Sequence, residues 1–141
     1  MPESRVERVS SWYLTRPVGL EDPEWFVNGA LLLKTDLSAE DLLTRLLEIE
    51  QSMGRERTIK WGPRVIDLDL LLYDEYVINT SFLTLPHPFL EKRKFVLEPL
   101  AEIAADTVHP LLGKTMEQLN RELSGEGQNV LLLKDQVKIR E

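Results

Sequence analysis

The clearest pattern of apolar and polar positions lies at residues 38–53, where apolar residues recur at helical spacing. Positions 42, 43, 46, 47, 49 and 53 form one stripe on a helix of about 3.6 residues per turn. Ser38 and Asp41 have the spacing of a capping box, and Gly54 follows where helices commonly end. The pattern therefore predicts a helix over residues 38–53.

Shorter runs rich in β-branched, aromatic and leucine residues predict strands. The two longest are 5–15 and 26–35, and the short loop between them favours antiparallel neighbours. The remaining predicted elements are short strands at 77–78 and 83–85, a helix over 91–105 interrupted at Pro99, a helix over 115–123 opened by a capping box, and a terminal strand at 130–133. This mixture predicts a single α+β domain over residues 1–141.

A different pattern occurs in the stretch Trp61–Tyr73, which begins as a loop and then alternates. If residues 66–73 form a strand, Asp67 and Asp69 share one face with their Cα atoms roughly 6.6 Å apart. Two carboxylates on an apolar strand are costly to bury without compensation. Because Mg²⁺ binds one or two carboxylates together with substrate phosphates, the stretch indicates a metal-phosphate site. The alternative is a half-exposed strand with polar residues facing outward.

Cations flank the acidic stretch on both sides. The loop 55–64 carries Arg57, Lys60 and Arg64, and positions 92–94 are Lys-Arg-Lys. Either cluster could be a solvated surface or a phosphate-binding element, since Arg and Lys are the usual phosphate partners. His87 lies between two prolines in a stiff turn, where a structural role and a ligand contact are both open.

Composition limits the function classes. The chain of 141 residues has a net charge of −7, which argues against non-specific nucleic-acid binding. No apolar run approaches the roughly 18 residues of a membrane helix, and the N-terminus has no signal-peptide core. The absence of cysteine excludes disulfides and thiolate metal sites and fits a cytoplasmic location.

Several separated motifs resemble the 6-hydroxymethyl-7,8-dihydropterin pyrophosphokinases. The strongest runs from Arg57 to Tyr73 and reads R-x-x-K-W-G-P-R-x-I-D-L-D-L-L-L-Y. The other motifs follow in the family's order and spacing; they are 9–19, Phe26-Val-Asn28, Leu85-Pro-His87, Arg93-Lys-Phe95 and Val108-His-Pro110. The resemblance covers about residues 5–124.

The resemblance implies a role for each matching residue. Asp67 and Asp69 would bind two Mg²⁺ ions that bridge the phosphates of ATP, and Arg57 and Arg64 would join them as catalytic residues. The residues expected to bind the pterin are Thr15, Pro17, Val18, Phe26, Asn28, Trp61 and Phe95. The residues expected to bind ATP are Glu50, Arg57, Trp61, Arg64, Leu70, Thr84, His87 and Arg93.

The resemblance also implies a ferredoxin-like sandwich with a mostly antiparallel sheet and helices packed on it. Family members usually begin with a strand, a Gly-Ser-Asn loop and a long helix, and this sequence starts after the segment that would match them. In that arrangement the first strand is an interior member of the sheet. We therefore expect the sheet to be completed by another chain, through self-association, or by the C-terminal strand at 130–133.

The activity implied is transfer of pyrophosphate from ATP to 6-hydroxymethyl-7,8-dihydropterin in folate biosynthesis, with no nucleic-acid or membrane partner. Such a transferase needs position and charge neutralisation more than a strong base, and no base stands out in the sequence. The alternatives are a catalytically impaired pterin- or nucleotide-binding remnant or fragment and, with only the net charge in its favour, an acidic interaction module.

Overall fold

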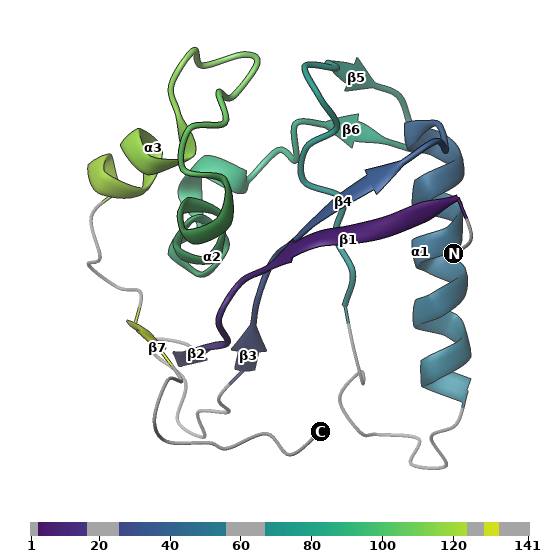
Figure 1. The fold of residues 1–141 in the computed structure, drawn as a ribbon, viewed down its shortest axis with the longest axis horizontal. Coiled ribbons are helices and arrows are strands. Elements are labelled where there is room, and N and C mark those ends of the chain that lie inside the picture. Colours follow the sequence, from purple (N-terminus) through teal and green to yellow (C-terminus); the bar gives the residue numbers. More distant parts are fainter. Residues whose placement is uncertain (1–2, 17–25, 56–66, 124–128, 133–141) are drawn as a thin grey trace.

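The computed structural model describes residues 3–16, 26–55, 67–123 and 129–132 (Figure 1). Within these ranges the chain is a mixed α+β structure, and its strands form small antiparallel sheets. The mixed α+β class predicted from the sequence is confirmed. In the described part of the chain, no helix combines the length and apolar character required to cross a membrane.

The two long strands predicted from the sequence form one hairpin that is broken in the middle. One arm comprises β1 (Ser4–Val9) and β2 (Tyr13–Arg16), and the other comprises β3 (Phe26–Asn28) and β4 (Leu31–Thr35). β1 pairs with β4 and β2 pairs with β3, both antiparallel as predicted.

The break has a local cause, which is the residue pair Ser10 and Ala30. The Ser10 hydroxyl accepts a hydrogen bond from the Ala30 N–H at 2.8 Å, so a side chain replaces a regular ladder bond. The Trp12 ring lies so close to Gly29 that an added Cβ would come within 3.0 Å of it. A side chain at position 29 would therefore require the Trp12 ring to shift, and the hairpin bends at residues 10–12 and 29–30.

The predicted C-terminal strand is confirmed as β7 (Asn129–Leu132), which pairs antiparallel with β2. The order in this sheet is β3-β2-β7. The β1–β4 pair forms a separate sheet, and among the described residues no further strand joins either of its outer edges. The C-terminal strand thus extends one half of the hairpin and leaves the other half two-stranded.

The helix predicted at 38–53 is α1 (Ala39–Arg55). The Ser38 hydroxyl accepts a hydrogen bond from the Asp41 N–H at 3.1 Å, which confirms the predicted N-terminal cap. Ala39 and Leu42 are buried, whereas Leu47 is 45% exposed and Met53 is 37% exposed. The apolar stripe of α1 is therefore covered over its first half only.

The prediction of a helix interrupted at Pro99 is wrong about the place of the break. A 3₁₀ turn, η1 (Leu90–Lys92), is separated from α2 (Lys94–Ala104) by Arg93, whose backbone is extended. Pro99 lies inside α2 and is almost fully buried. Burial of its ring offsets the backbone hydrogen bond that proline cannot make.

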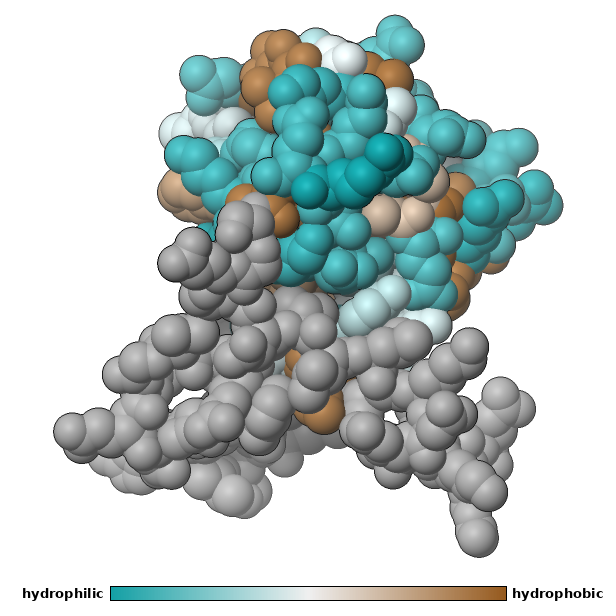
Figure 2. All heavy atoms as spheres, turned by 90° about the vertical axis from the view of Figure 1, so that its left-hand side faces the viewer, coloured by the Kyte–Doolittle hydropathy of each residue, from teal (hydrophilic) through white to brown (hydrophobic). Residues whose placement is uncertain are grey.

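The helix predicted at 115–123 is α3 (Met116–Glu122), and its capping box is complete. Gln118 N–H donates to the Thr115 hydroxyl at 3.1 Å, and Thr115 N–H donates to the Gln118 side chain at 2.8 Å. The face of the molecule formed by α2 and α3, shown in Figure 2, is mainly hydrophilic where it is described. The apolar side chains of this helix pair are instead buried between the helices.

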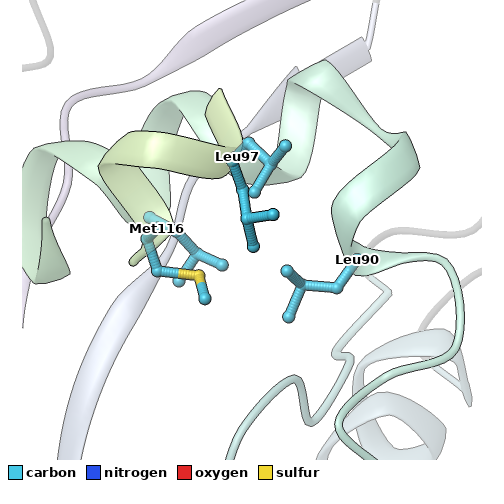
Figure 3. Close-up of a cluster of buried hydrophobic side chains, with 5 residues drawn as sticks. Leu90, Leu97 and Met116 are labelled. Carbon is cyan, nitrogen blue, oxygen red and sulfur yellow. The ribbon is translucent and has the colours of Figure 1, made fainter. Parts of the chain in front are cut away.

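The described structure contains two hydrophobic clusters. The first is formed by η1, α2 and α3 and centres on Leu90, Leu97 and Met116, which converge in Figure 3. The second lies beside the start of α1 and contains Ala39, Leu83 and Leu85. It includes residues of two short strands close to the predicted positions, β5 (Ile78–Asn79) and β6 (Thr84–Leu85).

Candidate active site

The segment Asp67–Tyr73 connects the two clusters, and it is not the strand that the alternation predicts. Leu71 and Leu72 pack against the first cluster, whereas Leu70 and Tyr73 pack against the second. The strict alternation of faces therefore fails after Leu70. A strand requires a hydrogen-bonded neighbour, and no described strand lies alongside this segment.

Other groups hold the segment in place instead of a strand ladder. The Glu50 carboxylate of α1 accepts a hydrogen bond from the N–H of Leu68, the residue between the two aspartates. The carbonyl of Leu71 accepts a hydrogen bond from the His87 N–H at 2.9 Å. Glu50 lies near the C-terminal end of α1, where the helix dipole disfavours an anion, and its hydrogen bond from Leu68 offsets that cost.

A cavity of about 370 Å³ lies along this segment and brings together six of the predicted site residues. They are Glu50, Asp67, Asp69, Leu70, Thr84 and His87. Asp67 and Asp69 are both exposed to it. The cavity also contains Phe82, which is 50% exposed and which sequence reasoning missed. Nothing in the sequence around Phe82 distinguishes it from a core aromatic.

His87 lies in this cavity as a neutral imidazole. Burial lowers its pKa below the ordinary value, and Arg93 lowers it further, although Asp69 and Glu91 act in the opposite direction. Its Nδ1 accepts a hydrogen bond from the Phe89 N–H at 3.3 Å. Nε2 is then the ring nitrogen that carries the proton, so His87 can donate a hydrogen bond to an anion in the cavity.

Arg93 and Phe95 lie beside each other at the start of α2. The Arg93 guanidinium is 5.0 Å from the centre of the Phe89 ring and 5.8 Å from that of Phe95. These contacts orient the cation without neutralising it. Phe89 is a second aromatic residue beside Arg93 that the sequence analysis missed, because the 3₁₀ turn that follows it was not predicted.

Two predicted pterin-binding residues are in direct contact on the β2–β3 hairpin. The Asn28 side-chain amide donates a hydrogen bond to the Thr15 hydroxyl at 2.6 Å. Thr15 and Phe26 are opposite each other in the strand register. The structure therefore brings the backbones of three predicted pterin-binding residues together.

The remaining predicted site residues lie outside the described residues; they are Pro17, Val18, Arg57, Trp61 and Arg64. Of the other cations considered, Lys60 also lies outside them, and Lys94 takes part in packing. The Lys94 ammonium donates to the Asn120 carbonyl at 2.8 Å and pairs with Glu98 at 3.5 Å. Lys94 therefore links α2 to α3.

The donor set at the cavity fits a hard divalent cation that is shared with a phosphate ligand. In the described part of the chain, no group of three or more acidic, histidine or cysteine side chains gathers to hold a metal alone. Asp67 and Asp69 supply two carboxylates, which is the number that Mg²⁺ typically takes from protein when phosphates and water complete its shell. The geometry is suited to a metal-bound nucleotide and unsuited to a closed structural metal site.

Comparison with known proteins agrees with these observations. The family model for 7,8-dihydro-6-hydroxymethylpterin-pyrophosphokinase (HPPK) matches residues 1–105. Three curated relatives are named 2-amino-4-hydroxy-6-hydroxymethyldihydropteridine pyrophosphokinase. The protein of Synechocystis is 51% identical to this chain over 114 residues. The protein of Aquifex aeolicus is 41% identical over 117 residues, and that of Methylorubrum extorquens is 43% identical over 126 residues.

The matches cover most of this chain and a smaller share of each relative. They span 81%, 83% and 89% of this chain, and 58%, 73% and 78% of the Synechocystis, Aquifex and Methylorubrum proteins respectively. The family model alone covers more than half of the sequence, and it includes Asp67, Asp69 and His87. The resemblance found in the sequence is confirmed, and the chain belongs to the 7,8-dihydro-6-hydroxymethylpterin-pyrophosphokinase family.

Proposed function

We propose that this chain transfers a pyrophosphoryl group from ATP to 6-hydroxymethyl-7,8-dihydropterin, a step of folate biosynthesis. The observation that carries the proposal is the shared cavity of Asp67, Asp69 and His87, within the part of the chain that matches the family. It combines two carboxylates for a metal-bound nucleotide with a neutral donor for a phosphate oxygen. Most of the relatives' length is matched, which supports extending their named activity to this chain.

In this reaction the pterin alcohol oxygen forms a bond to the β-phosphorus of ATP. The bond between that phosphorus and the bridging oxygen to the α-phosphate breaks, and AMP leaves with that oxygen. Such a transfer depends on alignment and charge stabilisation more than on covalent help from the protein. Two Mg²⁺ ions would neutralise the phosphate charge when bound.

The residues of the chain divide this work between two regions. Asp67 and Asp69 would hold the Mg²⁺ ions, and the cavity residues Glu50, Leu70, Thr84 and His87 would hold the ATP. Arg93, at the start of α2, would also contact the ATP. Thr15, Phe26, Asn28 and Phe95 would bind the pterin, whose flat ring favours aromatic stacking. Arg57, Trp61, Arg64, Pro17 and Val18 complete the proposed set through the resemblance of their motifs.

Three further expectations follow from membership of the family. We expect residues 1–141 to form one domain with a ferredoxin-like arrangement, acting in the cytoplasm. The open edges of the β1–β4 sheet support self-association as a way to complete it. A monodisperse monomer whose β1–β4 edges stay unpaired in a crystal structure would contradict that expectation.

The second candidate is a chain that binds pterin and nucleotide without turnover. Among the described residues no strand pairs with Asp67–Tyr73, which favours this candidate because a strand ladder would hold the two carboxylates more firmly. Both candidate functions predict binding of the pterin and the nucleotide, but only the first predicts formation of AMP and pterin pyrophosphate.

Release of AMP from ATP in the presence of 6-hydroxymethyl-7,8-dihydropterin and Mg²⁺ is the measurement that tests the proposal. We expect AMP and pterin pyrophosphate in equal amounts. Calorimetric binding of the pterin together with an inert ATP analogue, with no AMP formed from ATP, would support the binding protein instead. Absence of both binding and turnover would overturn both candidates.

A further inference from the structure

We infer that Glu102 is a positioning residue for the pterin site, an inference that rests on the proposed function. Glu102 lies on α2, far along the chain from the bend between β1 and β2 that it contacts. Its carboxylate accepts hydrogen bonds from the Ser11 N–H at 3.0 and 3.1 Å, from the Ser11 hydroxyl at 2.8 Å and from the Tyr13 hydroxyl at 2.7 Å. One side chain thus attaches α2 to the β1–β2 bend.

The attachment point is linked directly to the predicted pterin contacts. Tyr13 is opposite Asn28 in the strand register, so their side chains lie on the same face of the sheet. Thr15 follows Tyr13 by two residues and shares that face. Because the Tyr13 hydroxyl reaches Glu102, this is the face turned toward α2. The Asn28–Thr15 hydrogen bond is therefore on the α2 side of the sheet.

The helix carries the other predicted pterin contact on the same side. Phe95 and Glu102 are seven residues apart in α2, which places them within about 20° of each other around the helix axis and about 10.5 Å apart along it. The side of α2 that attaches to β2 through Glu102 is thus the side that presents Phe95. Glu102 fixes where Phe95 lies relative to Asn28 and Thr15.

Tyr13, one partner of Glu102, is buried, whereas Glu102 itself is exposed. Tyr13 is 8% exposed, and burial together with the hydrogen bond to Glu102 raises the pKa of its phenol well above the ordinary value. Tyr13 therefore stays protonated and donates to Glu102 throughout the physiological range. Hydrogen bonds to an ionised acceptor are among the stronger ones in proteins.

Glu102→Ala should raise the KM for the pterin by about tenfold, while kcat and the KM for ATP stay within about twofold. Loss of the Glu102 hydrogen bonds changes the distance between α2 and β2, which affects the pterin contacts and not the cavity at Asp67 and Asp69. Glu102→Gln keeps the shape and one acceptor oxygen and should fall between wild type and Glu102→Ala. Tyr13→Phe, which removes one of the bonds, should also be intermediate.

Glu117→Ala is the matched control, because Glu117 is an exposed glutamate on α3 that pairs with Arg121 of its own helix. Calorimetry with the pterin and with an inert ATP analogue plus Mg²⁺ separates the two binding events. An unchanged pterin KM in folded Glu102→Ala, or an equal rise of both KM values, would overturn the inference. If Glu102→Ala does not fold, the same criteria apply to Glu102→Gln.

The proposed function and this inference fail in distinguishable ways. If the wild-type chain binds the pterin but releases no AMP, the proposed enzyme activity is refuted. The role of Glu102 is then tested by comparing the dissociation constants for the pterin of the wild type and the Glu102 variants. If the wild-type chain releases AMP and Glu102→Ala has an unchanged KM for the pterin, only the role of Glu102 is refuted. A wild-type chain that does not bind pterin removes both.

Discussion

Asp67 and Asp69 are exposed residues on either side of Leu68, whose N–H is bonded to Glu50. Their side chains line the cavity rather than either hydrophobic cluster. Removing one carboxylate therefore changes the charge at the site with little effect on packing.

We expect Asp67→Ala and Asp69→Ala each to lower kcat/KM by roughly a thousandfold or more, since the charge that develops on the phosphates would lose its metal. The assay is AMP release at saturating Mg²⁺. Asp106→Ala, at an exposed turn after α2, serves as the control and should retain full activity. Near-normal turnover of either site variant would contradict the metal assignment.

His109 is the second residue whose state has a measurable consequence. It is 2% exposed, and its Nδ1 accepts hydrogen bonds from the N–H groups of Leu111 and Leu112 at 3.2 and 3.1 Å. Burial lowers its pKa, although Glu91, 3.9 Å from Nε2, acts in the opposite direction. The folded state therefore binds a proton at His109 less readily than the unfolded state does.

Stability should accordingly fall as the pH drops below about 6.5, the ordinary pKa of histidine, because only the unfolded chain then takes up the proton. One histidine changes the free energy of unfolding by at most about 1.4 kcal/mol per pH unit. His109→Asn keeps an acceptor for the two N–H groups and should flatten this dependence. Urea unfolding at pH 5 to 8 measures it, and identical slopes in both proteins would refute the assignment.

At the scale of elements, the Glu50 side chain of α1 accepts a hydrogen bond from the Leu68 N–H of the acidic segment, and Leu70 packs against the cluster at the start of the same helix. Among the described residues no strand pairs with this segment, so its position depends on this hydrogen bond, on the bond between His87 and Leu71, and on packing against the two clusters. The positions of the Asp67 and Asp69 carboxylates therefore depend on α1, although neither aspartate lies on that helix.

Glu50→Ala should raise the Mg²⁺ concentration needed for half-maximal turnover by about tenfold, because Asp67 and Asp69 are then less well positioned. Titration of activity with Mg²⁺ at fixed ATP measures the shift. Glu48→Ala, an exposed glutamate on the same helix, is the matched control. The positioning role would be excluded if the two variants had the same Mg²⁺ dependence.

The elements that could be predicted from the sequence are those with local causes. The helix α1 and the capping box at Thr115 depend on residues within a few positions of each other, and both are confirmed. The strand predicted at 66–73 depends on a neighbour that alternation cannot supply. The helix through Pro99 depends on burial in a core built from distant residues.

The site shows the same division. The resemblance assigned Glu50, Asp67, Asp69 and His87 to ATP and its metal ions, and the fold brings these four residues to one cavity. It could not show Phe82, because that residue reaches the cavity through the turn between β5 and β6. Glu102 was also missed, since its partners Ser11 and Tyr13 lie about ninety residues away.

At the scale of the whole molecule, two hydrophobic clusters stabilise the described structure. Leu97 is fully buried between α2 and α3 in the first cluster, as Figure 3 shows. No residue of the cavity at Asp67 and Asp69 belongs to that cluster's buried centre.

Leu97→Ala should lower the free energy of unfolding by about 2–5 kcal/mol, since it removes buried methyl groups and leaves a cavity. Leu111→Ala, at a position 65% exposed, should change it by less than about 0.5 kcal/mol. Urea denaturation of both variants makes the comparison. Equal losses would contradict the position of the first cluster.

The segment Asp67–Tyr73 packs against both clusters, since Leu71 and Leu72 contact the first and Leu70 and Tyr73 contact the second. Asp67 and Asp69, the proposed metal ligands, therefore lie next to residues that pack against both clusters, and we expect a small shift of one cluster relative to the other to move the two carboxylates. Random mutagenesis should consequently recover inactive variants that are still folded from both clusters, far from any substrate. Adaptation of this enzyme to heat or cold would then change the side chains that pack where the two clusters meet, and would leave Asp67, Asp69 and His87 unchanged.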